Sequence, residues 1–251
     1  MTVQPDGDQP GPRVRAPVFI QRWEPTAFLH WPVEVADVAR LLPPGCEPDT
    51  YDGVTYVGLI PLVIRGVRVF GAPPLPRVST FTELNVRLYS VDADGRRGIV
   101  FCSLDAERLV PVIAAQSTYR LPYKWSRMSY RHSGDEHTWT SMRRWPGPVG
   151  ARAHVRIRVG PPIAEPDGLT LFLTTRWALH TVVRGRTAYA VAQHDPWPLH
   201  RATVLDLDED VIAAAGLPAP AGEPHVVFSP GVSARIGPPI SLARRRHPTH
   251  R

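Results

Sequence analysis

Runs of β-branched and aromatic residues, separated by turns rich in proline and glycine, dominate the chain. Such runs favour extended strands, and proline clusters such as Pro43-Pro44 and Pro161-Pro162 fall where turns between strands are expected. The pattern predicts strands at Val54–Val69, Arg77–Tyr89, Gly98–Leu104, Ala151–Val159, Trp177–Val183 and Thr187–Gln193.

Helical spacing of apolar residues is confined to Val33–Leu42, Arg108–Tyr119 and Asp208–Ala215. The first segment ends before Pro43, and a residue that precedes proline disfavours helical backbone. The third begins with acidic residues, which suit the positive end of a helix dipole, and it meets Gly216. Strands in one sheet, with a few helices packed at its ends, predict an α+β fold that is mostly β.

The predicted strand at Arg77–Tyr89 has two faces of different character, because side chains alternate along a strand. One face carries Val78, Thr80, Thr82, Leu84, Val86 and Leu88, and the other carries Arg77, Ser79, Phe81, Glu83, Asn85, Arg87 and Tyr89. Two interpretations of the second face are open. It forms either a solvated outer surface or the wall of a polar cavity inside a barrel.

A hairpin is predicted next, with Arg184-Gly185-Arg186 as its three-residue loop. In that register His180 faces Ala190, and Arg176 faces His194. Small alanines opposite arginine and histidine would leave room for a ligand. They would equally suit close packing against a helix.

A length of 251 residues suits one large β domain, which we place at residues 17–240. Residues 1–16 are polar and rich in proline and glycine, and are expected to form a disordered tail; residues 241–251 form a basic tail. No apolar stretch approaches the roughly 20 residues of a membrane helix, and residues 1–16 lack the apolar segment of a secretory signal. We therefore expect a cytoplasmic protein that does not associate with membranes.

The net charge of +6 raises the question of a nucleic-acid partner. The arginines are scattered, whereas a nucleic-acid-binding protein concentrates its charge on one face or helix, so we expect no specific nucleic acid. Cys46 and Cys102 give neither metal-ligand spacing nor a disulfide framework. The sequence has neither a His-x-x-x-His pair nor clustered cysteines and histidines, which leaves a convergence of His30, His180 and His194 in space as the one alternative, and it lacks a glycine-rich phosphate loop. We therefore expect neither a metal nor a cofactor.

Several ordered segments of the chain resemble the DUF2071 (YqjF-like) family. They are Phe28-Leu29-His30-Trp31, Asp52-Gly53 with Val57-Gly58, Thr82-Glu83-Leu84-Asn85-Val86-Arg87, Phe101-Cys102-Ser103-Leu104-Asp105, Leu121-Pro122-Tyr123 with Met128, Leu173-Thr174-Thr175-Arg176 and His194-Asp195-Pro196-Trp197-Pro198-Leu199. Their order and spacing hold from about residue 18 to residue 238. The ordered set is specific, although no single segment is.

The resemblance implies an acetoacetate decarboxylase-like fold: a large antiparallel sheet curled around a central cavity, with a few peripheral helices. The decarboxylase uses a Schiff-base lysine that a second lysine follows in a Pro-Lys-Lys context. Over Pro122-Tyr123-Lys124 this motif places tyrosine at the nucleophile and Lys124 at the helper, so the catalytic pair is incomplete. The chain also departs from the family at Gln116, Thr175 and His180, where the resemblance leads us to expect arginine, glutamate and tyrosine.

Lys124 is the only lysine among 29 basic side chains, and its role has three open interpretations. It is a surface residue, a point charge that binds an anionic ligand, or a Schiff-base nucleophile shifted by one residue from the decarboxylase position. On a regular strand, Tyr123 and Trp125 would point to the face opposite Lys124.

The candidate catalytic residues are Lys124 and Glu83, and the candidate substrate-binding residues are Arg87, Asn85, Tyr123, Arg176 and His194. Glu83 suits a general acid or base, and Arg87 suits a carboxylate clamp. The two lie four residues apart on one strand face, roughly 13 Å along the backbone, with Asn85 between them. An exposed ionic ladder is the alternative for this pair. His194 either shuttles protons or caps the turn that follows it.

Three functions are compatible with these observations. We adopt a small-molecule enzyme that acts on a carbonyl or keto-acid substrate in the central cavity, as a lyase, an aldolase/dehydratase or an isomerase. The alternatives are a non-catalytic protein that binds an apolar acid in the cavity, and a scaffold protein with a packed interior. A homo-oligomer is compatible with all three. An open, polar cavity with Lys124 inside it would favour the enzyme, and an interior filled by large side chains would favour the scaffold. An open cavity with Lys124 outside it would leave the binding protein, or an acid–base enzyme without covalent catalysis.

Overall fold

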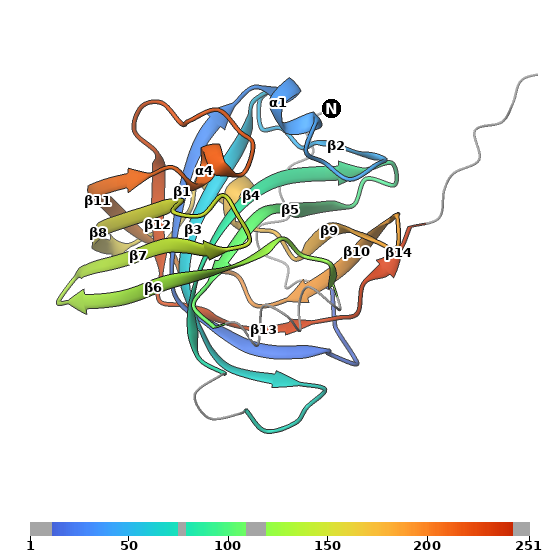
Figure 1. Cartoon of the computed structure of the whole chain (residues 1–251), viewed down its shortest axis with the longest axis horizontal. Helices are drawn as coiled ribbons and strands as arrows, with labels where there is room; N and C mark the ends of the chain where they lie inside the picture. The colour runs from blue at the N-terminus through green and yellow to red at the C-terminus, as the bar shows by residue number, and fades with distance from the viewer. Residues whose placement is uncertain (1–11, 75–78, 109–118, 243–251) are drawn as a thin grey trace, which may run out of the picture.

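The computed structural model describes residues 12–74, 79–108 and 119–242 (Figure 1). Within these ranges fourteen strands join in one sheet, and three short helices lie beside it, so the predicted α+β fold dominated by strands is confirmed. The strands are β1 (Phe19–Val33), β2 (Cys46–Pro48), β3 (Thr55–Val69), β4 (Phe81–Asp92), β5 (Arg97–Ala106), β6 (Tyr123–Ser133), β7 (Glu136–Trp145), β8 (Arg152–Pro162), β9 (Ala178–Val183), β10 (Arg186–Gln193), β11 (His200–Glu209), β12 (His225–Ser229), β13 (Val232–Ile236) and β14 (Ile240–Ser241). The helices are α1 (Val35–Ala39), α3 (Gly168–Thr174) and α4 (Val211–Ala214).

The six predicted strands are present as β3, β4, β5, β8, β9 and β10, with shifted ends. The predicted helices at Val33–Leu42 and Asp208–Ala215 contain the shorter α1 and α4. Most of the predicted helix at Arg108–Tyr119, and most of both predicted tails, lie outside the described residues. None of the helices within the described ranges is long and apolar enough to cross a membrane.

The sheet of the described residues is mixed: most of its strand pairs are antiparallel, as expected, and two are parallel. Strand β5 pairs in parallel with both β6 and β9, and it pairs with β4 in the antiparallel sense. A strand has two hydrogen-bonding edges, so three neighbours require that β5 divide one edge between two of them. β5 is therefore the branch point of the sheet.

This branching closes the strands into two circuits (Figure 1). In the first, β1, β3, β4, β5, β9, β10 and β13 pair in turn and return to β1; we call it the cavity circuit. In the second, β1, β3, β4, β5, β6, β7, β8, β11 and β12 do the same; we call it the packed circuit. Strands β1, β3, β4 and β5 belong to both circuits, and we call them the shared wall.

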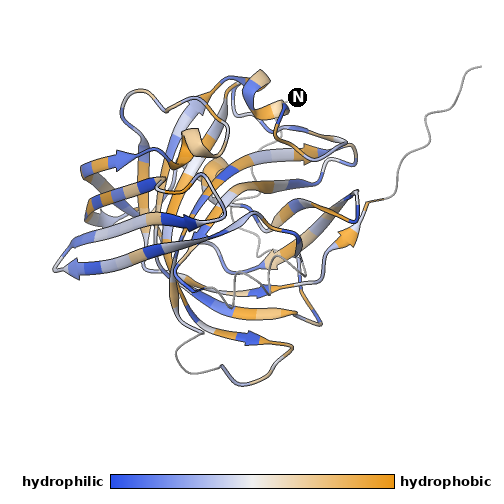
Figure 2. Ribbon diagram, viewed as in Figure 1, coloured by the Kyte–Doolittle hydropathy of each residue, from blue (hydrophilic) through white to orange (hydrophobic). Residues whose placement is uncertain are grey.

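The packed circuit is filled by the largest hydrophobic cluster of the described residues. The shared wall contributes buried side chains to it from one face of each strand, for example Leu84, Val86 and Leu88 of β4 and Leu29 and Trp31 of β1. Because side chains alternate along a strand, the opposite face of the shared wall points into the cavity circuit. Figure 2 shows the resulting alternation of hydrophobic and hydrophilic residues along these strands.

The β9–β10 hairpin differs from the predicted one by a single residue of register. Arg184 and Gly185 have φ angles of +51° and +74°, as in the two-residue loops of tight hairpins. His180 therefore faces Tyr189, with the ring centroids 5.1 Å apart, and does not face Ala190. The predicted opposition of alanine to His180 is wrong, because the loop has two residues and not three.

Candidate functional site

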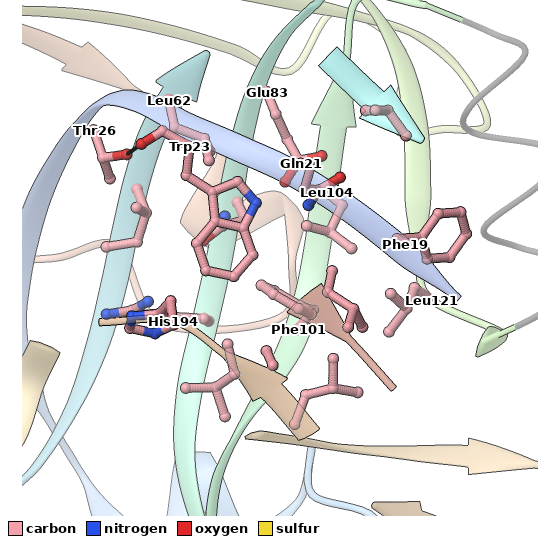
Figure 3. Close-up of a pocket in the computed structure, with 18 of the residues that line it drawn as sticks. Phe19, Gln21, Trp23, Thr26, Leu62, Glu83, Phe101, Leu104, Leu121 and His194 are labelled. Atoms are coloured by element: carbon pink, nitrogen blue, oxygen red, sulfur yellow. Dashed lines mark hydrogen bonds between the residues drawn. The ribbon is translucent and has the colours of Figure 1, made fainter. Parts of the chain in front are cut away.

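The cavity circuit holds a cavity of about 330 Å³, a volume at the lower end of the range for small-molecule sites. Side chains of the shared wall form one side, and β6, β9, β10, β13, α3 and several connecting segments contribute the rest of the lining (Figure 3). Most of the lining side chains are apolar. The interior of this circuit is therefore open, in contrast to the packed circuit.

Strand β4 supplies a polar stripe to the cavity. Phe81, Glu83, Asn85 and Arg87 all line it and are 4%, 4%, 5% and 7% exposed. Their face of the strand is thus the cavity wall, and its interpretation as a solvated outer surface is wrong. Tyr89, next on the same face, is fully buried beyond Arg87.

Glu83 occupies one end of this stripe. Its Oε2 accepts a hydrogen bond from the Tyr123 hydroxyl at 2.9 Å, and Gln21 also lines the cavity (Figure 3). Burial raises the pKa of Glu83 to about 7, although hydrogen bonds from Tyr123 and Asn85 act in the opposite direction. Burial, with the nearby Glu83, also raises the pKa of Tyr123 well above its usual value. Glu83 therefore changes its protonation near neutral pH, while Tyr123 keeps its proton.

Two arginines meet at the other end of the stripe. Arg176, which precedes β9, forms an ion pair with Asp49 at 3.0 Å, and Arg97 contacts the same carboxylate oxygen at 2.7 Å. Burial lowers the pKa of Arg176 to about 9, and the charge of Arg97 adds to this effect. Arg176 nevertheless remains charged at neutral pH. One carboxylate, Asp49, is thus shared between two cations.

Arg87 is held by neutral groups. Its Nη2 donates to the Leu173 carbonyl at 2.8 Å and to the Tyr89 hydroxyl at 3.1 Å. Nε of Arg87 and Nε of Arg176 are buried and have no hydrogen-bond partner among the described residues. Leaving buried donors unpaired is costly, and guanidinium groups pair strongly with carboxylates. This end of the cavity is therefore suited to an anion.

Arg87 donates a hydrogen bond to Tyr89, which in turn contacts the buried His30. The Tyr89 hydroxyl lies 2.6 Å from Nε2 of His30, and burial, with the charge of Arg87, lowers the pKa of His30 well below its usual value. Gly58 of β3 pairs with both His30 and Arg87. A Cβ at Gly58 would lie 3.0 Å from the His30 ring and 3.2 Å from Cγ of Arg87. The absence of a side chain at Gly58 thus allows the two residues to approach each other.

Aromatic rings form the middle of the cavity wall. Trp23 and Trp197 are stacked with centroids 5.9 Å apart, and Phe28 packs edge-on against Trp197 at 5.0 Å. His194 meets Trp23 edge-on at 5.5 Å, and its Nδ1 lies 2.7 Å from the carbonyl oxygen of Asp195. This last contact matches the turn-capping interpretation of His194, which also lines the cavity.

Lys124 does not line the cavity, which corrects its selection as a catalytic residue. Tyr123 points into the cavity, so alternation along β6 turns Lys124 to the opposite face. There its Nζ lies 3.5 Å from the carbonyl oxygen of Gly147. Lys124 therefore does not face a substrate that is held beside Glu83.

The structure thus gathers Glu83, Asn85, Arg87, Tyr123, Arg176 and His194 around one cavity and leaves Lys124 outside it. It adds Gln21, Trp23 and Trp197 to the lining, none of which we predicted. Trp197 lies in the His194–Leu199 segment that carries the family resemblance, which was an available signal. In the described part of the chain, no group of three His, Cys, Asp or Glu side chains is arranged to hold a metal ion.

The architecture is shared with solved enzyme structures at low sequence identity. The enduracididine biosynthesis enzyme MppR complexed with pyruvate superimposes with a TM-score of 0.61, at 14% identity over 92% of each chain. Acetoacetate decarboxylase from Legionella pneumophila also gives 0.61, at 12% identity over 94% of this chain and 92% of that one. The fold is therefore acetoacetate decarboxylase-like, as the resemblance implied.

The sequence relationship is more specific than the fold. A family model for DUF2071, described as an uncharacterised conserved protein, matches residues 20–233. YqjF of Bacillus subtilis (strain 168) is 33% identical over 212 residues, which are 84% of this chain and 87% of YqjF. The chain belongs to the DUF2071 family.

Proposed function

We propose that the cavity is the active site of a small-molecule enzyme that acts on a carbonyl or keto-acid substrate by acid–base catalysis at Glu83. The observation that carries this proposal is a buried carboxyl group on the cavity wall whose pKa is raised to about 7. A general acid or base is most effective when its pKa lies near the working pH. Strongly shifted carboxyl groups in clefts concentrate at catalytic sites.

The reaction type follows from the groups around Glu83. A Glu83 carboxylate takes a proton from the carbon next to a carbonyl; the electron pair of the broken C–H bond forms the enolate C=C bond, and negative charge develops on oxygen. The protonated Glu83 then returns the proton at the same or another atom of the substrate. Isomerisation, aldol addition and dehydration of β-hydroxy carbonyl compounds all begin with this kind of step.

Two further observations support a non-covalent mechanism in this chain. Its only lysine, Lys124, is not a cavity-lining residue, so a lysine Schiff base has no candidate amine there. The fold neighbours include an enzyme complexed with pyruvate and an acetoacetate decarboxylase. A shared fold does not transfer a reaction, and it serves here only to indicate carbonyl compounds as the first substrates to test.

The test is hydrogen–deuterium exchange at carbon in D₂O, followed by proton NMR, with a panel of aldehydes, aryl ketones and 2-, 3- and 4-oxo acids. We expect exchange with at least one member, and a loss of about 100-fold or more in Glu83→Gln, the usual contribution of a general base. Glu209→Gln is the matched control, because Glu209 also has a raised pKa but lies on β11 of the packed circuit. Exchange that survives in Glu83→Gln, or binding of panel members without any exchange, would overturn the proposal.

A further inference from the structure

The acid–base group and the cations of the cavity lie at two separate ends, with Asn85 between them. Glu83 and Tyr123 form one end, and Arg87 and Arg176 form the other. Glu83 and Arg87 are four residues apart on β4, which corresponds to roughly 13 Å of strand. In the view of Figure 3 the ring of Trp23 lies between Glu83 and His194.

The side chain of Arg87 extends away from Glu83, so it does not bring the guanidinium group closer to the Glu83 carboxylate. Its Nη2 donates to the hydroxyl of Tyr89, which lies two residues further along β4 and away from Glu83. Glu83 is bound to Tyr123 of β6 and to Asn85 through its carboxylate, and not to Arg87. The acid–base group and the cationic end are therefore anchored apart.

The cationic end has an excess of two positive charges, one of which belongs to the partly exposed Arg97. Arg87, Arg97 and Arg176 lie there with one carboxylate, Asp49, which pairs with Arg97 and Arg176. Arg87 is 7% exposed and, among the described residues, contacts only neutral hydrogen-bond partners. Burial of an unpaired charge is costly, so one anionic group on a ligand would be strongly favoured at Arg87.

The cavity walls are mostly apolar, although Asn85 and His194 also line them. Four aromatic residues, Trp23, Trp197, Phe28 and Phe101, contribute to these walls. The Phe28 ring lies 5.4 Å from the guanidinium carbon of Arg87, and Phe101 pairs with Arg87 across the sheet, whereas Leu62 pairs with Glu83. Offset stacking and edge contacts with tryptophan favour an aromatic or similarly flat group over a polar chain. Asn85 and His194 are polar, but burial lowers the pKa of His194, and neither side chain offers a full charge to a second charged group.

We propose that the ligand class of this cavity is a flat, apolar monocarboxylic acid whose carboxylate binds Arg87 beside Arg176 and whose carbonyl group lies at the far end, beside Glu83. This inference rests on the proposed function, because it takes Glu83 as the reactive end. It excludes short keto acids as preferred substrates. In pyruvate and acetoacetate one or two bonds separate the carboxylate carbon from the carbonyl carbon, and such molecules cannot contact both ends at once.

Matched synthetic probes test each part of the proposal by isothermal titration calorimetry. 4-Acetylphenylacetate carries the carboxylate, the ring and a remote ketone. 4-Acetylphenylacetamide lacks the charge, 4-ethylphenylacetate lacks the ketone, and pyruvate lacks the ring and the separation. We expect 4-acetylphenylacetate to bind at least about tenfold more tightly than pyruvate or the amide, a factor that corresponds to 1.4 kcal/mol.

Variants assign the charge preference to one side chain. Arg87→Met should weaken binding of 4-acetylphenylacetate by about tenfold or more and leave the amide nearly unchanged. Arg127→Met, on the exposed side of β6, is the matched control and should alter neither. Equal binding of acid and amide, or an equal effect of Arg87→Met on both, would overturn the proposal, as would pyruvate binding as tightly as the aromatic acid.

The outcomes separate this inference from the proposed function. Glu83→Gln should keep the preference for acid over amide while losing exchange at carbon. If aromatic acids bind through Arg87 and no carbonyl compound exchanges, the ligand class stands and the enzymatic proposal fails. If pyruvate exchanges through Glu83 and binds as well as the aromatic acid, the enzymatic proposal stands and the ligand class fails.

Discussion

The hydroxyl of Tyr123 donates a hydrogen bond of 2.9 Å to Glu83, whereas the next residue, Lys124, points to the other side of the same strand. The site that the chain builds at this position is therefore a carboxyl–phenol pair and not an amine. A hydrogen bond to a carboxylate stabilises its charged form. Tyr123 thus limits how far burial raises the pKa of Glu83.

Removing this hydrogen bond should raise the pKa of Glu83 above its value of about 7. We predict this shift in Tyr123→Phe, because the buried carboxylate then loses a donor. Carbon-13 NMR titration of glutamate-labelled protein measures it directly. Tyr130→Phe is the control, since Tyr130 lies on the same strand but contacts His137. An unchanged or lower pKa in Tyr123→Phe would contradict the prediction.

The raised pKa of Glu83 should make the protein less stable as the pH rises. Above the usual glutamate pKa of about 4.3 the unfolded chain releases this proton, whereas the folded protein retains it until about pH 7. Across that interval the folded state binds more protons, so the free energy of unfolding falls with increasing pH. Glutamine keeps the shape of the side chain without titrating. Between pH 5 and pH 8, the free energy of unfolding of Glu83→Gln should therefore rise by about 2–3 kcal/mol relative to that of the unsubstituted protein.

Urea unfolding of both proteins at pH 5 and pH 8 measures this difference. All other titratable groups are the same in the unsubstituted protein and in Glu83→Gln. They include the buried histidines whose pKa values burial lowers. Their contributions cancel when the two proteins are subtracted. If the free energy of unfolding of the two proteins depends on pH in the same way, the pKa of Glu83 is not raised.

Replacement of Lys124 should leave ligand binding and carbon exchange within about twofold of the unsubstituted protein, because surface substitutions away from the cavity have small effects. The residue contacts the Gly147 carbonyl on the face of β6 that points away from the cavity. Borohydride trapping with the same carbonyl panel, read by intact mass, should give no adduct at residue 124. A ligand-dependent adduct that disappears in Lys124→Arg would restore the Schiff-base mechanism.

Gly58→Ala should weaken anion binding although residue 58 does not line the cavity. The new Cβ would lie 3.0 Å from the His30 ring and 3.2 Å from Cγ of Arg87, so one of them must move. We expect a loss of about 1–3 kcal/mol of stability, as for other overpacked sites, and about tenfold weaker binding of 4-acetylphenylacetate. Thermal unfolding and calorimetry provide the two readouts.

Gly160→Ala is the matched control for this substitution. Gly160 also lies in a strand, but a Cβ there would meet its nearest atoms at 3.4 Å. It should retain both stability and binding. If Gly58→Ala behaves like Gly160→Ala, the close approach of His30 and Arg87 has no bearing on the anion site.

The sequence predicts the strands of the shared wall that are rich in β-branched residues, because such strands are buried on both sides. It misses β6, β7 and β11, whose outward positions carry arginine, histidine and aspartate, as at Arg127, His132 and Asp206. Their inward positions do alternate, but the polar residues between them obscure the signal. Asp167 before α3 is a missed helix-start signal, since its carboxylate caps the helix at Thr170.

The part of the site that lies on a single strand can be predicted from the sequence. Glu83, Asn85 and Arg87 share a face by alternation alone, so the polar stripe follows from the sequence once its face is known to be inside. Asp49 and His30 come from distant segments and reach the arginine end only through tertiary pairing. The side of β6 on which Lys124 lies depends on Tyr123 facing inward, which the sequence leaves open.

In the shared wall, residues that stabilise the fold alternate with residues that face the ligand. On β4, Leu84, Val86 and Leu88 secure the packed circuit, while Glu83, Asn85 and Arg87 between them face the ligand space. Substitutions at the second set can accumulate in evolution with little penalty to the first. A chain built this way can change its chemistry while its architecture persists, which offers a physical reason why proteins only 12–14% identical to this one retain the same fold.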